Sequence, residues 1–223
     1  MVRVLGVDGC LGGWVAVALE DGQLDGCRFV ESIAELVDDP AIVIAVDIPL
    51  GETDPSERAA DRAARAYISP RTSTVFSTPP LAALDTATYA EASALARTLT
   101  GKGISKQAWN LGPKMLDARM HWCADPWRFR EVHPECSFRA MGGATLTSKK
   151  QWSGLRDRLT LHRRAGIDLI VDEPALPDAA RADDVVDAAA TAWTAHRIAS
   201  GDATSLPDPP EHDADGRPVA VWV

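Results

Sequence analysis

Acidic residues end several apolar, strand-like runs of this sequence. Asp8 ends "RVLGVD", Asp47 ends "AIVIAVD", and Glu131 ends "WRFRE". A carboxylate at the end of a buried run is costly unless something compensates its charge. In open α/β sheets the carboxyl ends of the strands are also the places where ligands bind. The pattern therefore predicts a shared acidic site at one edge of a sheet.

A late helical segment adds two further carboxylates. Asp184 and Asp187 are three residues apart in "RADDVVDAAATAWTAHRIASG", so they share one face of a helix. The alanines that follow are small enough to let this helix lie close against the sheet. Carboxylates that converge repel one another and become protonated unless a cation neutralises them.

Divalent cations suit such a group of oxygen ligands. Mg²⁺ or Mn²⁺ is the natural choice for a carboxylate cluster. Two such ions about 4 Å apart can activate a water and stabilise the leaving oxygen of a phosphodiester. We expect Asp8, Asp47, Asp184 and Asp187 to be metal ligands, and these four and Glu131 to be catalytic.

Other polar residues are candidates for catalysis or substrate binding. His133, in "EVHPE", is a candidate general base or proton shuttle, or else a histidine that is hydrogen-bonded for structural reasons. Lys149 and Lys150 are candidate phosphate ligands, with a solvated helix face as the alternative. Arg71, in "RTSTVFSTPP", is a candidate substrate-binding residue that could line the cleft from the insertion. Glu135 is a candidate substrate-binding residue.

The charge of the chain is unevenly distributed. The net charge is −9, which by itself argues against a nucleic-acid partner. Residues 97–164, however, hold 14 Lys and Arg against five acids, and the remaining residues hold nine basic and 27 acidic groups. This is either ordinary clustering on solvated faces or a basic wall beside an acidic one, as an enzyme that grips a polyanion through metal ions would need.

The order of the predicted elements indicates an α/β protein. Strand-like runs over 2–8, 14–19 and 24–30, separated by glycine-rich turns, predict an antiparallel meander. The apolar run before Asp47 predicts a strand buried on both faces, which is usually parallel. With the run before Glu131, we expect a mixed five-stranded sheet flanked by helices.

The rest of the chain is predicted to surround this sheet. We expect a single domain over 1–223, in which 52–127 form a mainly helical insertion with a break at Gly112-Pro113. A Pro/Asp-rich linker follows Gly201, and the final strand "PVAVWV" could pair with another chain to give a homo-oligomer.

Several of these motifs resemble those of a known family. "VLGVDGCLGGWVAV" is similar to the first-strand hairpin of RNase H-like nucleases, especially the Holliday-junction resolvase branch, and "DDVVDAAATAWTA" resembles the last helix of that branch. More closely, "VDIPLG", "RTSTVFSTPP", "GKGISKQAWNLGPKMLDA", "EVHPECSFRAMGG", "SKKQWSGLRDRL" and "ADDVVDAAATAWTAHR" together resemble the predicted RNase H-like nucleases of domain-of-unknown-function family 429. The resemblance covers nearly the whole chain and implies an RNase H-like fold.

The resemblance also bears on the site residues. Asp8, Asp47, Asp184 and Asp187 match the acidic positions of the superfamily, although Asp47 stands where the resolvases often carry Glu. Glu131 and Glu135 match only the "EVHPE" motif of the narrower family. The implied activity is that of a metal-dependent nuclease or phosphodiesterase.

Composition excludes some function classes and leaves others open. No apolar run approaches the ~20 residues of a membrane helix, and four widely spaced cysteines fit neither a zinc site nor a disulfide framework. We therefore expect a cytoplasmic protein with a nucleic acid or nucleotide substrate and no membrane partner. The alternatives are an ATP-dependent phosphotransferase of the same superfold, which generally needs two copies of the fold, and a non-catalytic binding protein that keeps the acidic cluster.

Overall fold

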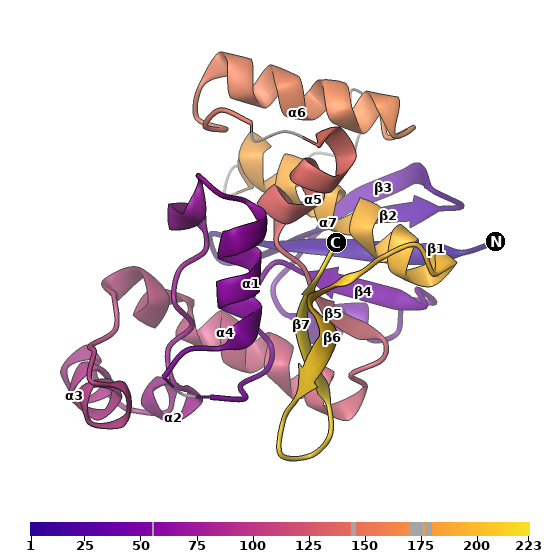
Figure 1. The fold of residues 1–223 in the computed structure, drawn as a ribbon. Coiled ribbons are helices and arrows are strands. Elements are labelled where there is room, and N and C mark those ends of the chain that lie inside the picture. Colours follow the sequence, from indigo (N-terminus) through magenta and orange to yellow (C-terminus); the bar gives the residue numbers. More distant parts are fainter. Residues whose placement is uncertain (55, 144–145, 170–175, 177–179) are drawn as a thin grey trace.

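The computed structural model describes residues 1–54, 56–143, 146–169, 176 and 180–223. Within them a five-stranded sheet is covered on both faces, and a two-stranded sheet stands beside it (Figure 1). In chain order the elements are β1 (Arg3–Cys10), β2 (Gly13–Glu20), β3 (Gln23–Val30), η1 (Ile33–Leu36), β4 (Val43–Val46), α1 (Ala59–Tyr67), η2 (Thr72–Thr74), α2 (Leu81–Leu84), α3 (Tyr89–Thr100), α4 (Lys106–Ala124), β5 (Phe129–Glu131), α5 (Pro134–Gly142), α6 (Trp152–Arg164), α7 (Ala182–Ser200), β6 (Ser205–His212) and β7 (Pro218–Trp222).

The larger sheet has the strand order β3-β2-β1-β4-β5. β1, β2 and β3 pair antiparallel, whereas β4 is parallel to β1 and β5 is parallel to β4. The short hairpin turns place Gly12 and Gly22 at φ 82°, a conformation that glycine adopts without a steric penalty. The predicted fold class, an RNase H-like mixed sheet that begins with an antiparallel meander, is confirmed.

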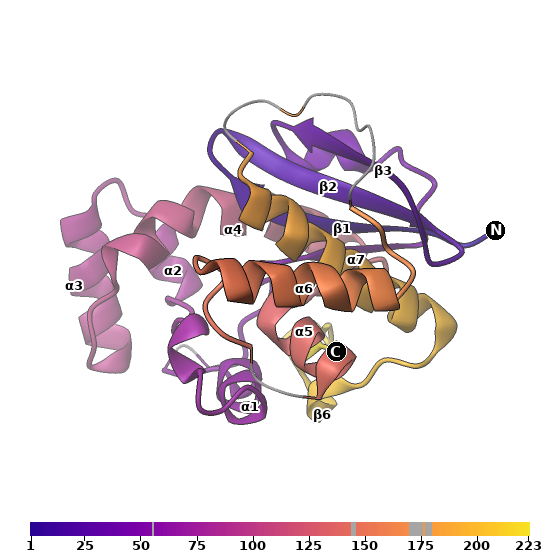
Figure 2. The ribbon, with the colours of Figure 1, turned by 90° about the horizontal axis from the view of Figure 1, so that it is seen from above.

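The alternation of side chains along β1 divides the core into two layers. Leu5 and Val7 face a cluster that includes residues of α4 and η1. Val4 faces the opposite cluster, which includes the alanines of α7. Figures 1 and 2 show α7 lying across the sheet, with α5 and α6 stacked outside it. Gly6 and Asp8 have the same parity as Val4, so they lie on the α7 side.

Gly6 allows α7 to touch the backbone of β1. A Cβ atom at Gly6 would lie 1.9 Å from the Ala192 nitrogen and 2.2 Å from the Ala188 oxygen, which no side chain tolerates. Ala188, Ala189 and Ala192 are fully buried against the sheet. The close approach predicted from the alanine run is therefore correct, and it places the first turns of α7 beside the carboxyl end of β1.

The predicted break at Gly112-Pro113 is wrong. α4 has 19 residues, and it is unbroken at Pro113. A proline inside a helix costs about 3 kcal/mol, but Met115 and Trp122 further along α4 are buried in the core, and their burial offsets that cost.

The predicted linker after Gly201 is also wrong in part, because residues Ser205–His212 form β6. This strand pairs antiparallel with β7, so the final strand finds its partner within the chain. Trp222 of β7 also forms a bridge to Val132, just beyond β5.

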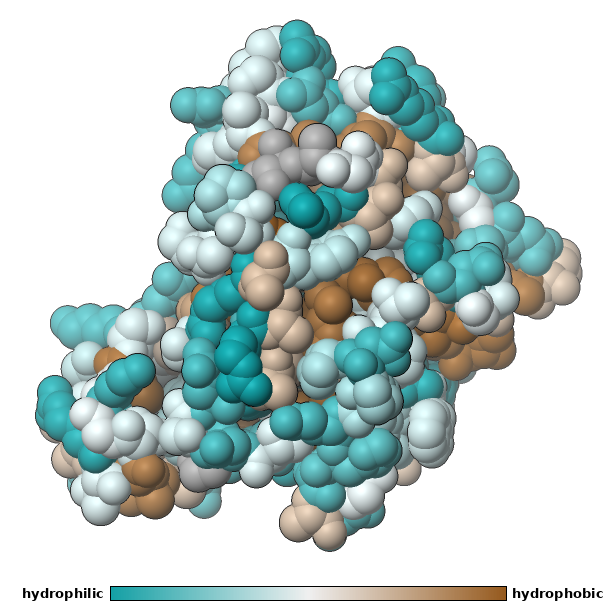
Figure 3. Space-filling view, in the orientation of Figure 1, coloured by the Kyte–Doolittle hydropathy of each residue, from teal (hydrophilic) through white to brown (hydrophobic). Residues whose placement is uncertain are grey.

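Figure 3 shows hydrophobic residues at the centre of this face of the molecule, among hydrophilic residues. None of the helices in the described part of the chain has the length and apolar character needed to cross a bilayer.

We predict that Gly6→Ala destabilises the protein by about 3 kcal/mol or more, because the new methyl group forces α7 away from β1. Urea unfolding measures the change. Gly9→Ala is the matched control in the same strand, since its Cβ would approach only Lys114, at 3.1 Å, and Trp14, at 3.6 Å. Equal stability of the two variants would contradict the packing described here.

Candidate metal site and its cavity

Three carboxylates converge where β1 and β4 end. Asp8, Asp47 and Asp187 each offer one oxygen, and these oxygens lie within 4.8 Å of one another. Val7 pairs with Val46 in the parallel register, and Asp47 N donates to Val7 O at 2.8 Å, so the next residue of each strand reaches the same edge. Asp187 reaches the same edge from α7, which packs across the face of the sheet. Three of the four predicted metal ligands are thus brought together.

Burial raises the pKa of all three carboxylates. Burial raises the pKa of Asp8 well above its usual value, and repulsion from Asp47 and Asp187 raises it further. Burial also raises the pKa of Asp47. The pKa of Asp187 rises to about 6 through burial, although the ion pair with Lys149 opposes the shift. The ionised group is therefore costly to maintain without a neighbouring positive charge.

Lys149 is the cation next to this group. Its Nζ contacts Asp187 Oδ2 and lies 3.6 Å from Asp183 Oδ2. Burial alone lowers the pKa of Lys149, but the attraction of Asp187 and Asp8 outweighs burial and raises it, so the side chain stays charged. His133, which lines the same cavity, also lowers the pKa of Asp47 by its charge, yet the pKa values of all three carboxylates stay raised.

The donor set fits a hard divalent cation. The group offers only carboxylate oxygens, and Asp8 and Asp187 are more than nine-tenths buried. Mg²⁺ and Mn²⁺ favour such ligands, and a cation would offset the repulsion that adds to the raised pKa values of Asp8 and Asp187. Asp8, Asp47 and Asp187 are the residues that would hold it.

Asp184 lies outside the group of three. It is one turn earlier on α7, and its Oδ2 accepts a hydrogen bond from Arg181 N at 2.9 Å. Because Asp184 lies in the first turn of α7, its carboxylate is drawn to an unpaired backbone N–H at the helix start.

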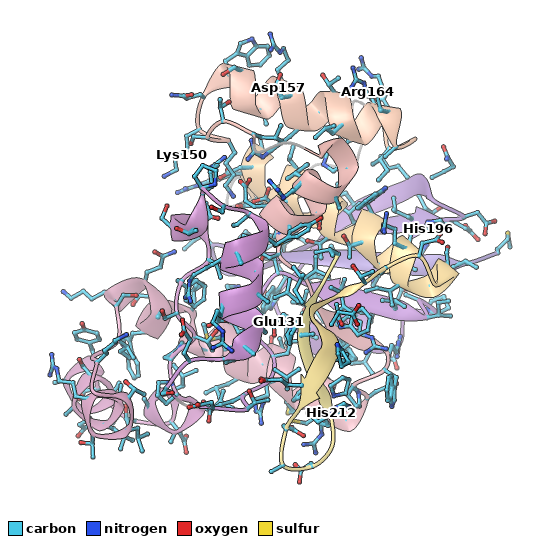
Figure 4. All side chains as sticks on the ribbon, viewed as in Figure 1. Glu131, Lys150, Asp157, Arg164, His196 and His212 are labelled. Carbon is cyan, nitrogen blue, oxygen red and sulfur yellow. The ribbon has the colours of Figure 1, made fainter. Side chains whose placement is uncertain are left out.

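Glu131 is not one of the group of three, although it lines the same cavity. It pairs in register with Val46, whose side chain points away from α7. Its two oxygens accept from Arg58 at 2.6 and 2.8 Å, and one of them also accepts from Leu50 N at 2.8 Å. In Figure 4 Glu131 lies near the middle of the molecule, well apart from Lys150. Both carboxylate oxygens are occupied, so Glu131 acts as a structural anchor in this state.

The partner of Glu131 is a residue that the sequence analysis did not single out. Arg58 is 2% exposed and also binds Asp61, whose carboxylate accepts from Thr78 N at 2.8 Å. In the sequence, this ion pair was indicated only by the spacing of Arg58 and Asp61, which are three residues apart at the start of a helix. This network attaches α1 and the segment around Thr78 to the end of β5.

His133 caps a helix. Its Nδ1 lies 3.2 Å from Glu135 N and its Nε2 lies 3.3 Å from Thr74 O. Burial lowers the pKa of His133, but a hydrogen bond with Cys136 and the charges of Cys136 and Asp47 outweigh burial and raise the pKa to about 10. Both ring nitrogens have a partner, and His133 also lines the cavity that holds the three carboxylates. Glu135 binds Arg158 at 2.5 Å and lies 3.6 Å from Arg71.

The carboxylates line a cavity of about 420 Å³. Its lining includes all four candidate substrate-binding residues, and it also includes Lys114 and Gln107 of α4, which the sequence analysis did not propose. The remaining walls are partly apolar and include Ile48, Val75, Phe76, Leu111 and Val221.

The fold and the site together define a class. A mixed sheet of this strand order, with carboxylates at the ends of two parallel strands and on the helix that crosses them, is RNase H-like. The chain belongs to the family described as "Protein of unknown function (DUF429)", whose family model matches residues 6–212.

Two solved structures are similar to this chain. Thermus thermophilus RuvC in complex with Holliday junction substrate aligns with a TM-score of 0.35 and 13% identity, over 91% of this chain and 98% of that chain. A second structure of Thermus thermophilus RuvC aligns with a TM-score of 0.34 and 14% identity, over 90% and 97% of the two chains. Among curated proteins, no sequence matches this chain.

We predict that Asp8→Asn raises the melting temperature of the metal-free protein at pH 7.5. The raised pKa of Asp8 means that the folded wild type is favoured when this group is protonated and loses stability as the pH rises through that pKa. The asparagine side chain has no charge, and its amide oxygen can still accept the Gly9 N–H that Asp8 accepts at 2.8 Å. Each kcal/mol gained corresponds to about 2–4 °C, and the difference between the proteins narrows toward pH 4.

The same melting experiment with Mn²⁺ tests the metal site. Wild type is stabilised by the ion, because only the folded state gathers the three ligands, whereas Asp8→Asn is not. Asp85→Asn, at an exposed position, should behave as wild type in both conditions. A Mn²⁺ response that survives in Asp8→Asn would contradict the assignment.

We further predict that Lys149→Gln binds Mn²⁺ at least about tenfold more tightly than wild type, equivalent to about 1.4 kcal/mol. The substitution removes an ammonium group that occupies Asp187 and repels an incoming cation. Isothermal titration calorimetry gives the dissociation constants. Lys150→Gln is the control, because this neighbour lines the same cavity and no ion pair joins it to a carboxylate of the described residues. Weaker binding in Lys149→Gln would show that the lysine supports the metal.

Proposed function

We propose that this protein is a metal-dependent phosphodiesterase that acts on a nucleic acid or nucleotide substrate, with Mg²⁺ or Mn²⁺ as the cofactor. The observation that carries the proposal is the convergence of Asp8, Asp47 and Asp187, the first and last buried and Asp47 half-buried, beside a cavity that also contains cationic side chains. A divalent cation held there would act as a Lewis acid toward the phosphodiester and its attacking water.

The residues of the chain have separate tasks in this reaction. Asp8, Asp47 and Asp187 hold the cation, and Lys149 offsets negative charge beside Asp187. Arg71 and Lys150 line the cavity where the phosphate oxygens of a substrate would lie. His133 orients α5, because its Nδ1 caps that helix.

Hydrolysis of the phosphodiester exchanges one ester bond for a bond to water oxygen. The oxygen of a water forms a bond to phosphorus, and the ester bond from phosphorus to the leaving oxygen breaks. The leaving oxygen takes up a proton, and the water gives up one. The products are a phosphomonoester and an alcohol.

The alternatives are less well supported. A phosphotransferase of the same superfold needs two copies of the sheet, whereas the described residues form one five-stranded sheet and one two-stranded sheet. A purely structural acidic cluster would be expected to pair with arginines, as Glu131 does, yet Asp8 and Asp47 have no such partner among the described residues.

The proposal predicts hydrolysis of phosphodiesters that depends on Mn²⁺ or Mg²⁺ and on Asp8. Purified protein is assayed on bis(4-nitrophenyl) phosphate, short DNA and RNA strands and cyclic nucleotides. Asp8→Asn should lower kcat/KM by about 10³-fold or more, about 4 kcal/mol in the barrier, and Asp85→Asn should leave it unchanged. No metal-dependent hydrolysis on any substrate would refute the proposal and leave a non-catalytic metal-binding protein.

A further inference from the structure

The walls of the cavity restrict the substrate that can reach the carboxylates. Resting on the proposed function, we infer that the site takes a phosphodiester of nucleotide size, such as a dinucleotide, and excludes a continuous duplex. The inference follows from three walls, each attached to the body of the protein, and from a bridge that joins two of them.

The first wall is the segment from Arg71 to Thr78, and it is firmly anchored. Val75 is buried in a cluster with residues of α1 and β7. Its carbonyl oxygen accepts from Arg65 Nε at 3.1 Å, and Thr78 N donates to Asp61 at 2.8 Å. Asp61 belongs to the buried network of Arg58 and Glu131, so this wall is fixed to β5 and does not behave as a loose lid.

The second wall is the segment over 146–150, and Arg71 joins it to the first. Arg71 Nη1 donates to Leu146 O at 2.5 Å and to Thr147 O at 2.9 Å. Arg158, which is fully buried in α6, donates to the same Thr147 oxygen at 2.8 Å and to Glu135 at 2.5 Å. Lys149 of this segment holds Asp187, so the bridge lies directly beside the candidate metal ligands.

The third wall is α4, which is attached to the first hairpin. The ammonium group of Lys114 lies 4.4 Å from the centre of the Trp14 ring and donates to Gly13 O. Leu111, one turn earlier, lines the cavity on the same side. The carboxylates therefore line a cavity bounded by three fixed walls.

The size and lining of the cavity suit a nucleotide. About 420 Å³ lies within the range of about 300–1,000 Å³ that small-molecule sites occupy. Ile48, Phe76 and Leu111 offer apolar surface for a base, and Lys150 and Arg71 offer charge for phosphate oxygens. A phosphate within a duplex is flanked on both sides by further backbone, which an open groove accommodates and a cavity with joined walls does not.

Competition binding tests this inference. The probe is a fluorescent 5′-phosphorylated diadenylate, bound to wild-type protein in Ca²⁺ and measured by anisotropy. Unlabelled diadenylate, a 20-nucleotide adenylate strand and a 20-base-pair duplex are the competitors. We expect the dinucleotide to compete at least tenfold better than the duplex at equal concentration of phosphodiester.

Opening the bridge should change this preference. Arg71→Ala removes both hydrogen bonds to the second wall, so the 20-nucleotide strand should gain at least threefold relative to the dinucleotide. Arg62→Ala is the matched control, because Arg62 is an exposed arginine of α1 that is not among the described residues lining the cavity. Circular dichroism and the Mn²⁺ response of the melting temperature show whether Arg71→Ala remains folded with an intact metal site.

The outcomes separate this inference from the proposed function. The size restriction is overturned if the duplex displaces the labelled dinucleotide as effectively as unlabelled dinucleotide does. It is also overturned if the duplex is hydrolysed faster than diadenylate in Mn²⁺. Either result leaves the phosphodiesterase proposal standing. If none of the three nucleic acids binds, while Mn²⁺ still stabilises wild type but not Asp8→Asn, the size inference is also overturned and the metal site remains. If Mn²⁺ does not raise the melting temperature of wild type, the proposed function itself is refuted.

Discussion

The arrangement of this protein depends on the contact between the backbones of β1 and α7 at Gly6. Because a Cβ atom there would lie 1.9 Å from a backbone nitrogen of α7, the two elements can meet only if this position is glycine. That contact places Asp187 next to Asp8, whose position is set by β1, and next to Asp47, whose position is set by the parallel register of β4. The chemistry of the site thus follows from a packing requirement two residues earlier on the same strand.

Gathering three carboxylates has a thermodynamic consequence. Burial raises the pKa values of Asp8, Asp47 and Asp187, and repulsion between carboxylates adds to the shifts of Asp8 and Asp187, so their ionised forms oppose folding near neutral pH. The large apolar layers on both faces of the sheet supply the stability that tolerates this. Lys149 offsets part of the charge, and a bound cation would offset the rest, which links metal binding to the stability of the whole fold.

The elements between β4 and β5 turn an open sheet edge into a cavity. Without them, the carboxyl ends of β1 and β4 would face solvent along an open groove. α1 is fixed by the buried group of Arg58, Glu131 and Asp61, and Arg71 then connects the following segment to the residues before α6. Glu131, which the sequence suggested as a catalytic acid, therefore contributes by positioning a wall.

The local sequence was enough to predict the antiparallel meander, the buried strand before Asp47 and the close approach of an alanine-rich helix. These features depend on turn glycines, on apolar periodicity and on side-chain size, which are local properties. The sequence alone could not tell that Glu131 would bind Arg58 and not join Asp8, Asp47 and Asp187, because a strand of three residues has no clear alternation and its side is decided by pairing with β4. It could not tell that Asp184 would cap α7, that Lys149 would contact Asp187, or that Arg71 would reach Thr147, since each depends on a partner brought near only by folding. Residue type and spacing determined which groups were available, and the tertiary structure decided which of them face one another, because the direction of a side chain is set by register and packing between segments distant in the chain.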